Sequence, residues 1–169
     1  MLNDKILTEY LNSALNIFKN AGIVLPKNAA VNLYHHKGKN KIYETGALFV
    51  NIINRDYCKS FVVMLPGQNY PNHYHIQKTE SCYVYYGDFF IELEGKIYNL
   101  SAGELINIDR RQSHSFGTKG GVLFEEISTT YVPNDSIYFD EKIKNASYAE
   151  RRTTLTSEDW SEIISKWKM

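Results

Sequence analysis

Residues 67–87 read GQNYPNHYHIQKTESCYVYYG, and this stretch decides which fold the chain can adopt. Successive side chains of a β-strand alternate between its two faces, so His73 and His75 present two imidazoles on one side. Glu80 follows across a short bend, and His114 on a later strand can reach the same centre. Three imidazoles and one carboxylate leave positions open for water or substrate and suit Mn, Fe, Co, Ni or Zn. The stretch therefore predicts one bound divalent metal.

The sequence around this stretch has the pattern of short strands. From Ala47 to about Val132, runs rich in β-branched and aromatic residues alternate with turn signals. The expected strands cover residues 47–54, 60–65, 81–86, 88–94, 96–100, 104–109, 112–118 and 121–130. We expect no helix between them, which argues against a parallel fold built from βαβ units. The pattern indicates an all-β sandwich, jelly roll or small barrel.

Helices are expected on both sides of the strand region. Apolar residues recur at helical spacing over residues 4–20, and Asn3 or Asp4 can cap the start of that helix. A second helix is expected over residues 157–167, with Thr156 as its N-cap. The remaining flanking segments, which are polar and of mixed charge, are expected to be irregular.

A length of 169 residues suits a single domain spanning residues 1–169. We expect an N-terminal helical arm (1–45), a β-barrel core (46–132) and a C-terminal arm with a helix (133–169). The irregular part of the first arm, residues 27–45, holds His35 and His36, which we expect at the surface rather than as ligands. The irregular part of the second arm is expected over residues 133–155.

The overall charge limits the classes of partner. The chain has 19 Lys and Arg against 19 Asp and Glu, a formal net charge of zero. Nucleic acid and anionic membranes both favour a basic surplus, so neither is expected as the main partner, whereas self-association is plausible. The first ten residues lack the apolar core of a signal peptide, and we expect a cytoplasmic protein. Cys58 and Cys82 are accordingly expected to be reduced core thiols.

Two spaced patterns resemble the motifs of the cupin superfamily. The first is Gly67, five residues, His73, one residue, His75, four residues, Glu80, six residues and Gly87; the second is Gly103, ten residues and His114. The resemblance implies a β-barrel, a double-stranded β-helix or jelly roll, whose three His and one Glu ligands point into the lumen. Motif two departs from the family pattern at turn positions. Asp109 replaces the usual Pro, Arg111 the usual Gly, and Thr118 the usual Asn.

Within the superfamily, the chain is most similar to the D-lyxose isomerase-like cupins. This group includes cupin segments found beside or fused to sialic-acid-type synthases of surface-polysaccharide pathways. The resemblance covers most of residues 10–140, is weak over 30–60, and includes the run HYHIQKTE at 73–80. It implies aldose–ketose isomerisation of a sugar through a cis-enediol intermediate, manganese as the metal and a homodimer. It also places Lys78 and Glu126 at the acid and base positions.

Several alternatives stay open at the level of the sequence. Only one of Glu125 and Glu126 can face the lumen, because neighbouring strand residues point in opposite directions. We expect that residue to be Glu126, with a pKa raised by burial, and we expect a nearby cation to lower the pKa of Lys78. Arg110 and Arg111 precede His114 and could meet an anionic sugar, although a solvated turn is the simpler interpretation.

The function itself also has alternatives. A cupin with these ligands could bind a sugar or sugar acid without turning it over, as a module serving a surface-polysaccharide pathway. It could also be an oxygenase, since the fold alone does not decide the reaction. Asp135 and Asp140 could belong to a lid over the site, although nothing in the sequence requires it.

Overall fold

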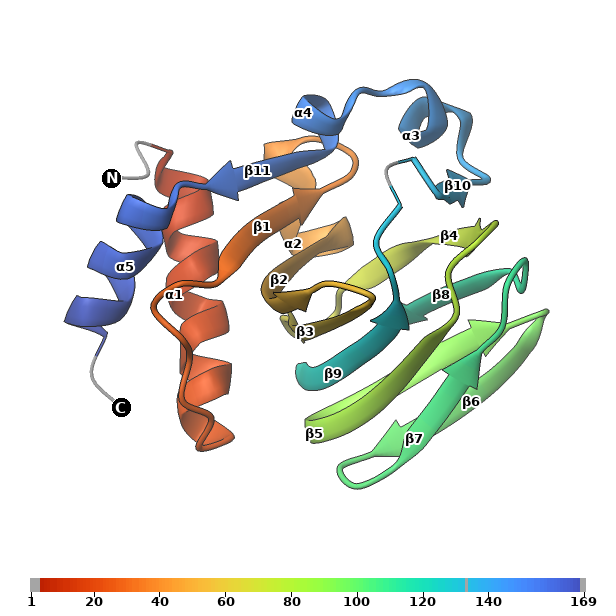
Figure 1. Ribbon diagram of the computed structural model, residues 1–169, viewed down its shortest axis with the longest axis horizontal. Coiled ribbons are helices and arrows are strands. Elements are labelled where there is room, and N and C mark those ends of the chain that lie inside the picture. The colour runs from red at the N-terminus through yellow and green to blue at the C-terminus, as the bar shows by residue number, and fades with distance from the viewer. Residues whose placement is uncertain (1–3, 133, 168–169) are drawn as a thin grey trace.

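The computed structural model describes residues 4–132 and 134–167, and its strands form one curled antiparallel sheet (Figure 1). The strands run in the order β10-β4-β8-β5-β9-β3-β2-β1-β11, and β6 and β7 both pair with the long strand β5. Their bounds are β1 Ala30–His35, β2 Gly46–Asn54, β3 Tyr57–Met64, β4 Asn69–His75, β5 Glu80–Leu93, β6 Lys96–Ser101, β7 Leu105–Ile108, β8 His114–Gly117, β9 Val122–Thr129, β10 Ser136–Tyr138 and β11 Arg152–Leu155.

The helices lie before, beside and after the sheet. Their bounds are α1 Lys5–Asn20, α2 Ile42–Thr45, α3 Glu141–Asn145, α4 Tyr148–Arg151 and α5 Ser157–Lys166, with a 3-10 turn at Lys39–Lys41. Asp4 caps α1 by accepting from the backbone N–H groups of Ile6 and Leu7, while the other candidate, Asn3, lies outside the described residues. Thr156 caps α5 as predicted. Among the described helices, none is both long and apolar enough to span a membrane.

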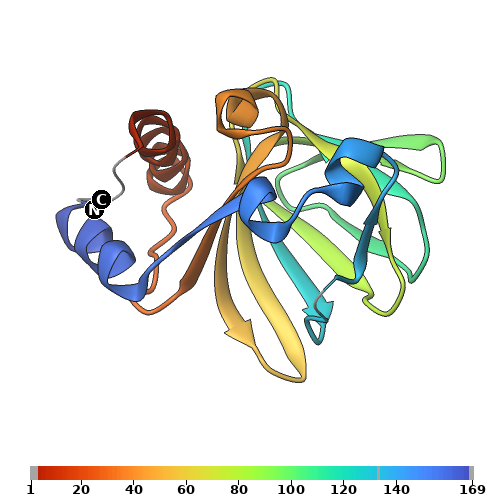
Figure 2. The same ribbon diagram turned by 90° about the horizontal axis from the view of Figure 1, so that it is seen from above.

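The two faces of the sheet carry separate apolar cores. One core packs α1 and α5 against the outer face of β1, β2 and β3, so that both helices lie outside the barrel (Figure 2). The other core fills the interior with residues such as Val62, Phe89, Phe116 and Phe124. Strand β9 shows the alternation that separates them, because Leu123 joins the outer core and Phe124 the inner one. The expected jelly-roll barrel with an N-terminal and a C-terminal helix is confirmed.

Three local predictions were wrong. The two segments expected to be irregular, 27–45 and 133–155, hold regular elements among their described residues: β1 and α2 in the first, and β10, α3, α4 and β11 in the second. Residues 81–86 and 88–94 form the single strand β5, because the chain continues through Gly87 with a positive φ of 84°. His35 and His36 are buried rather than exposed, at 2% and 4% exposure. His73 and His75 do lie on a strand, as their spacing implied; this strand, β4, was only absent from the expected ranges.

Helices α3 and α4 lie across one end of the barrel (Figures 1 and 2). Ser147 and Glu150 form a capping box at α4, which ends at Arg151 and passes directly into β11. Strand β11 pairs antiparallel with β1, and this pairing sets Arg152 opposite Tyr34. The C-terminal segment therefore closes part of the barrel mouth above the interior core.

Candidate metal centre and its cavity

Three buried imidazoles meet inside the barrel. His73 and His75 lie on β4, and His114 is the first residue of the neighbouring strand β8, where it pairs in register with His73. One ring nitrogen from each of the three lies within 4.8 Å of the others. All three side chains are at most 4% exposed. The structure thus brings together the three His residues that the sequence pattern predicted as ligands.

The protonation of these rings leaves nitrogens free to bind a metal. Nδ1 of His73 lies 2.9 Å from the backbone carbonyl of Pro71, and Nδ1 of His114 lies 3.0 Å from that of Gln112. A carbonyl only accepts, so each Nδ1 carries a proton, and in the neutral ring the lone pair is then on Nε2. Burial lowers the pKa of His73 well below its usual value, and the adjacent His114 and His75 lower it further. The His73 ring is therefore neutral, as a metal ligand must be.

Glu80 adds a carboxylate to the same cluster. It is the first residue of β5, and its oxygens lie 3.2 Å from Nε2 of His75 and 3.4 Å from Nε2 of His114. Burial alone raises the pKa of Glu80, but the charge of Lys78 and the nearby rings of His114 and His75 outweigh it and hold that pKa well below its usual value. Glu80 is thus an anion beside the three imidazoles.

Lys78 and Glu126 lie beside this cluster. Nζ of Lys78 donates to Oε1 of Glu126 over 3.1 Å and also forms an ion pair with Glu80. Glu126 faces the interior, whereas Glu125 faces the other side of β9, where it pairs with Lys59 and accepts from the Tyr85 hydroxyl. Of the two neighbouring carboxylates, Glu126 is therefore the one that faces the lumen.

The pKa of Glu126 is shifted in the expected direction, whereas the pKa of Lys78 is shifted in the opposite one. Burial raises the pKa of Glu126, Glu80 adds to the increase, and Lys78 only partly offsets it. Burial lowers the pKa of Lys78, but the charges of Glu126 and Glu80 reverse that effect and raise it above its usual value. The expected lowering of the Lys78 pKa is therefore wrong, because the protein groups around its ammonium are two carboxylates, which raise that pKa. Lys78 enters the site as a proton donor.

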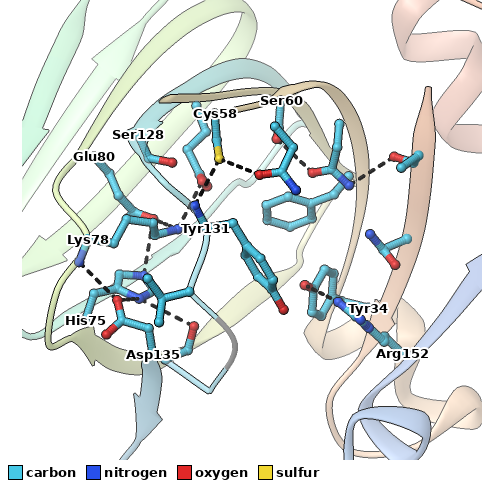
Figure 3. Close-up of a pocket in the computed structure, with 18 of the residues that line it drawn as sticks. Tyr34, Cys58, Ser60, His75, Lys78, Glu80, Ser128, Tyr131, Asp135 and Arg152 are labelled. Atoms are coloured by element: carbon cyan, nitrogen blue, oxygen red, sulfur yellow. Dashed lines mark hydrogen bonds and ion pairs between the residues drawn. The ribbon is translucent and has the colours of Figure 1, made fainter. Parts of the chain in front are cut away.

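Asp135 holds the turn that carries Lys78 (Figure 3). This buried carboxylate accepts from the backbone N–H groups of Ile76, Gln77 and Lys78, at 3.1, 2.9 and 3.0 Å. Its second oxygen lies 3.7 Å from Nδ1 of His75. Asp135 is thus part of the support of the site. Asp140, the other acid considered as a lid residue, caps α3.

The cluster opens into a cavity of about 490 Å³. That volume falls within the range of small-molecule sites. His73, His75, Lys78, Glu80 and Glu126 all line it. Arg110 and Arg111, the cations considered from the sequence, are exposed and do not line it.

Two other arginines, Arg151 and Arg152, do line the cavity. Their position depends on the pairing of β11 with β1, so no local sequence signal singled them out.

The residues present fit a divalent metal. Nε2 of His114 is fully buried and has no hydrogen-bond partner within the described part of the chain, although Glu80 lies near it. A buried polar atom without a partner calls for an explanation, and a metal ion supplies one. Three imidazoles and one carboxylate form a donor set that first-row divalent metals accept. Cys58 and Cys82 are free thiols, as expected, and are not part of this cluster.

Fold and site together have the features of a cupin. Residues 60–127 match the family described as the cupin domain, which supports placing the chain in the cupin superfamily. These residues include most of β3, all of β4 to β8, most of β9 and all four candidate ligands. Among curated proteins, none matches this chain significantly.

Solved structures of sugar isomerases share the fold. L-ribose isomerase of Cellulomonas parahominis, solved with no ligand, superposes with a TM-score of 0.69 at 13% identity, covering 84% of this chain and 94% of that one. The same enzyme with L-ribose gives 0.68 at 14% identity, with 81% and 92% covered. L-ribose isomerase of Geodermatophilus obscurus gives 0.67 at 15% identity, with 82% and 93% covered. At these identities the likeness establishes the fold and leaves the reaction open.

Proposed function

We propose that this protein is a metal-dependent aldose–ketose isomerase acting on a small sugar. The observation that carries the proposal is the hydrogen-bonded pair of Lys78 and Glu126, which lines the same cavity as the candidate ligands His73, His75 and Glu80. A cupin that only binds sugar needs no such pair beside its metal. The fold shared with L-ribose isomerases supports the proposal. The resemblance to D-lyxose isomerase-like cupins suggests the narrower activity.

The reaction moves a proton between C1 and C2 of the sugar through a cis-enediol. His73, His75, Glu80 and His114 would hold a divalent ion, with manganese favoured by the resemblance. When bound, that ion supplies a Lewis acid that stabilises negative charge developing on the sugar oxygens. In the proposed mechanism Glu126 takes the proton from C2 and returns it to C1. The raised pKa of Glu126 makes its carboxylate a stronger base than an ordinary one.

Lys78 completes the proton transfers between the oxygens. Its ammonium would protonate O1 as the enediol forms, and its amine would then accept the proton of the O2 hydroxyl as the ketose forms. Contacts with Glu80 and Glu126 hold Nζ between the ligand cluster and the base. Apolar and aromatic walls, including Phe49, Tyr70 and Phe116, limit the access of water.

A turnover assay with matched variants tests this function. Protein purified and loaded with Mn²⁺ is incubated with a panel of pentoses and hexoses, free and phosphorylated, and ketose formation is followed by NMR. We expect turnover of at least one aldose, and a loss of about 10²-fold or more in kcat for Glu126→Gln and Lys78→Met. Both variants should retain metal.

The outcomes separate isomerase from binding protein. Sugar-dependent thermal stabilisation without turnover of any sugar would favour the alternative, a binding cupin, and reject the isomerase. Full activity of Lys78→Met would reject the mechanism while leaving the metal centre. The homodimer and the cytoplasmic location stay predictions, and light scattering of the purified protein tests the first.

A further inference from the structure

The cavity has a second charged end, away from the metal centre. Arg151, the last residue of α4, and Arg152, the first residue of β11, both line it. Figure 3 shows Arg152 and Tyr34 on the side of the pocket opposite His75 and Lys78. A ligand that fills the cavity from the metal centre outward would therefore meet these guanidinium groups.

The positive charge at this end is not neutralised by the protein. Among residues 4–132 and 134–167, no carboxylate forms an ion pair with Arg151 or Arg152. Instead both guanidinium groups lie against the ring of Tyr148, with 5.0 and 4.6 Å from Cζ to the ring centre. The buried Nε of Arg151 has no hydrogen-bond partner in the same residues. Two like charges that share one ring repel each other unless an anion lies between them.

The carboxylates that line the cavity all have partners at the end that holds the candidate metal centre. Its lining includes three carboxylates, Glu80, Glu126 and Asp135, and three cations, Lys78 and the two arginines. Lys78 pairs with Glu80 and Glu126, while Asp135 is held by backbone N–H groups. A divalent metal at the imidazoles would add two further positive charges. The cavity as a whole therefore attracts a negative ligand, and the unpaired charge lies at the arginine end.

The chemistry of the two side chains indicates an oxyanion. A guanidinium stacked on an aromatic ring keeps its N–H edge available, and that edge matches phosphate or carboxylate in a bidentate manner. Arg152 already donates to the Tyr34 hydroxyl over 3.4 Å, which orients its plane. Neutral polar side chains that suit sugar hydroxyl groups also line the cavity, among them Asn32, Asn51, Ser60 and Thr154.

We propose that Arg151 and Arg152 form an anion subsite, and that the sugar bound here carries a phosphate or carboxylate on the end remote from the metal. The choice of a sugar as ligand rests on the proposed function. The subsite itself rests on the unpaired arginines. Substrate specificity would then be set by residues from the C-terminal segment, far in sequence from the metal ligands.

Calorimetric binding to the metal-loaded protein tests the subsite without relying on turnover. The probes are a pentose 5-phosphate, the same pentose unmodified, a hexuronic acid and inorganic phosphate. We expect the phosphorylated or the acidic sugar to bind at least about tenfold more tightly than the neutral pentose. Comparing the affinity for the pentose 5-phosphate with that for the hexuronic acid shows whether the bound anion is a phosphate or a carboxylate.

Matched variants assign the effect to the two arginines. Arg151→Gln and Arg152→Gln should remove the preference for the anionic sugar, Arg152→Lys should retain part of it, and the exposed Arg110→Gln should retain all of it. Thermal melts check that each variant is folded. Equal affinity for neutral and anionic sugars, or an equal loss in Arg110→Gln, would overturn the subsite.

The results also separate this inference from the isomerase. Turnover of a neutral sugar with no anion preference would reject the subsite and keep the enzyme. Tight binding of an anionic sugar without turnover would keep the subsite and reject the enzyme.

Discussion

At the scale of single residues, Asp135 shows how the site is held in place. Its carboxylate accepts from three consecutive backbone N–H groups, those of residues 76–78, and its side chain is buried. The turn between β4 and β5 therefore depends on a residue from the loop before β10. Lys78 leaves this turn directly, so the position of its ammonium depends on the same three hydrogen bonds.

Replacing Asp135 by Asn should disturb this turn without removing a metal ligand. The amide group puts a donor where the Oδ2 acceptor faces the N–H of Lys78, so one buried hydrogen bond is lost and two donors oppose each other. We expect unfolding to become easier by about 1–3 kcal/mol, and kcat to fall more than KM rises. Urea denaturation and steady-state kinetics measure both effects. An unchanged free energy of unfolding would show that the turn does not depend on the Asp135 carboxylate.

His36 is a buried imidazole outside the metal centre. Its Nδ1 lies 3.2 Å from the carbonyl of Thr45, and its Nε2 lies 3.0 Å from the Tyr138 hydroxyl. Burial lowers the pKa of His36 to about 3, so the ring stays neutral in the folded chain. In the unfolded chain it takes up a proton at its ordinary pKa of 6.5.

The folded state should therefore lose stability in acid through His36. Between pH 6.5 and about 3 the unfolded chain binds the extra proton, so the free energy of unfolding falls as the pH falls. The slope from this one group approaches about 1.4 kcal/mol per pH unit, and above pH 6.5 it vanishes. Urea denaturation of metal-free wild type and His36→Gln at pH 7 and pH 5 isolates the effect. Equal pH slopes for the two proteins would contradict it.

At the scale of elements, local sequence patterns indicated the candidate site residues more successfully than they indicated the outer strands of the sheet. His73 and His75 share a face because of their two-residue spacing, which any strand would impose. The alternation of β9 left Glu125 and Glu126 open, since both faces of that strand are apolar; the outer core against α1 explains why. Strand β1 was missed although Val31 and Leu33 are fully buried, because short polar segments surround it.

Strand β5 shows why a glycine is not always a break. The sequence suggested two strands at Gly87, yet the strand passes through it at positive φ with a shift in register between Val84 and Tyr86. A Cβ built on Gly87 would lie 1.9 Å from the carbonyl oxygen of Gly121, so only glycine fits where these two segments meet. Gly87 thus lets one continuous strand pair with β7 and β9 before it and with β6 and β8 after it.

The variant Gly87→Ala should accordingly be strongly destabilised. Left-handed backbone strain costs on the order of 1–3 kcal/mol, and the overlap with the Gly121 carbonyl adds to it. Gly103→Ala is the matched control, because Gly103 also has a positive φ of 95° but no atom near its added Cβ. Thermal melts should show the larger loss for Gly87→Ala. Equal losses in the two variants would mean that backbone strain alone explains the glycine.

At the scale of the whole molecule, the cavity joins segments that local patterns cannot relate. The candidate metal centre comes from β4, β5 and β8, and the spacing of its His and Glu residues in the sequence was enough to suggest that they meet. The arginine end comes from the pairing of β11 with β1, which joins Tyr34 to Arg152 across most of the chain. Loop closure over such a separation leaves no periodic signal in the sequence, so Arg110 and Arg111 were considered in place of Arg151 and Arg152.

The metal centre on which the account rests is tested most directly by elemental analysis of the purified protein. The wild type should carry about one divalent first-row metal ion per chain, as the donor set requires. The double variant His73→Gln with His75→Gln should carry almost none, while Lys78→Met should carry as much as the wild type. Binding to the folded state alone also means that added metal should raise the melting temperature of the wild type. A wild type that remains metal-free after incubation with Mn²⁺, Fe²⁺, Co²⁺, Ni²⁺ and Zn²⁺, or a double variant that retains full metal, would contradict it.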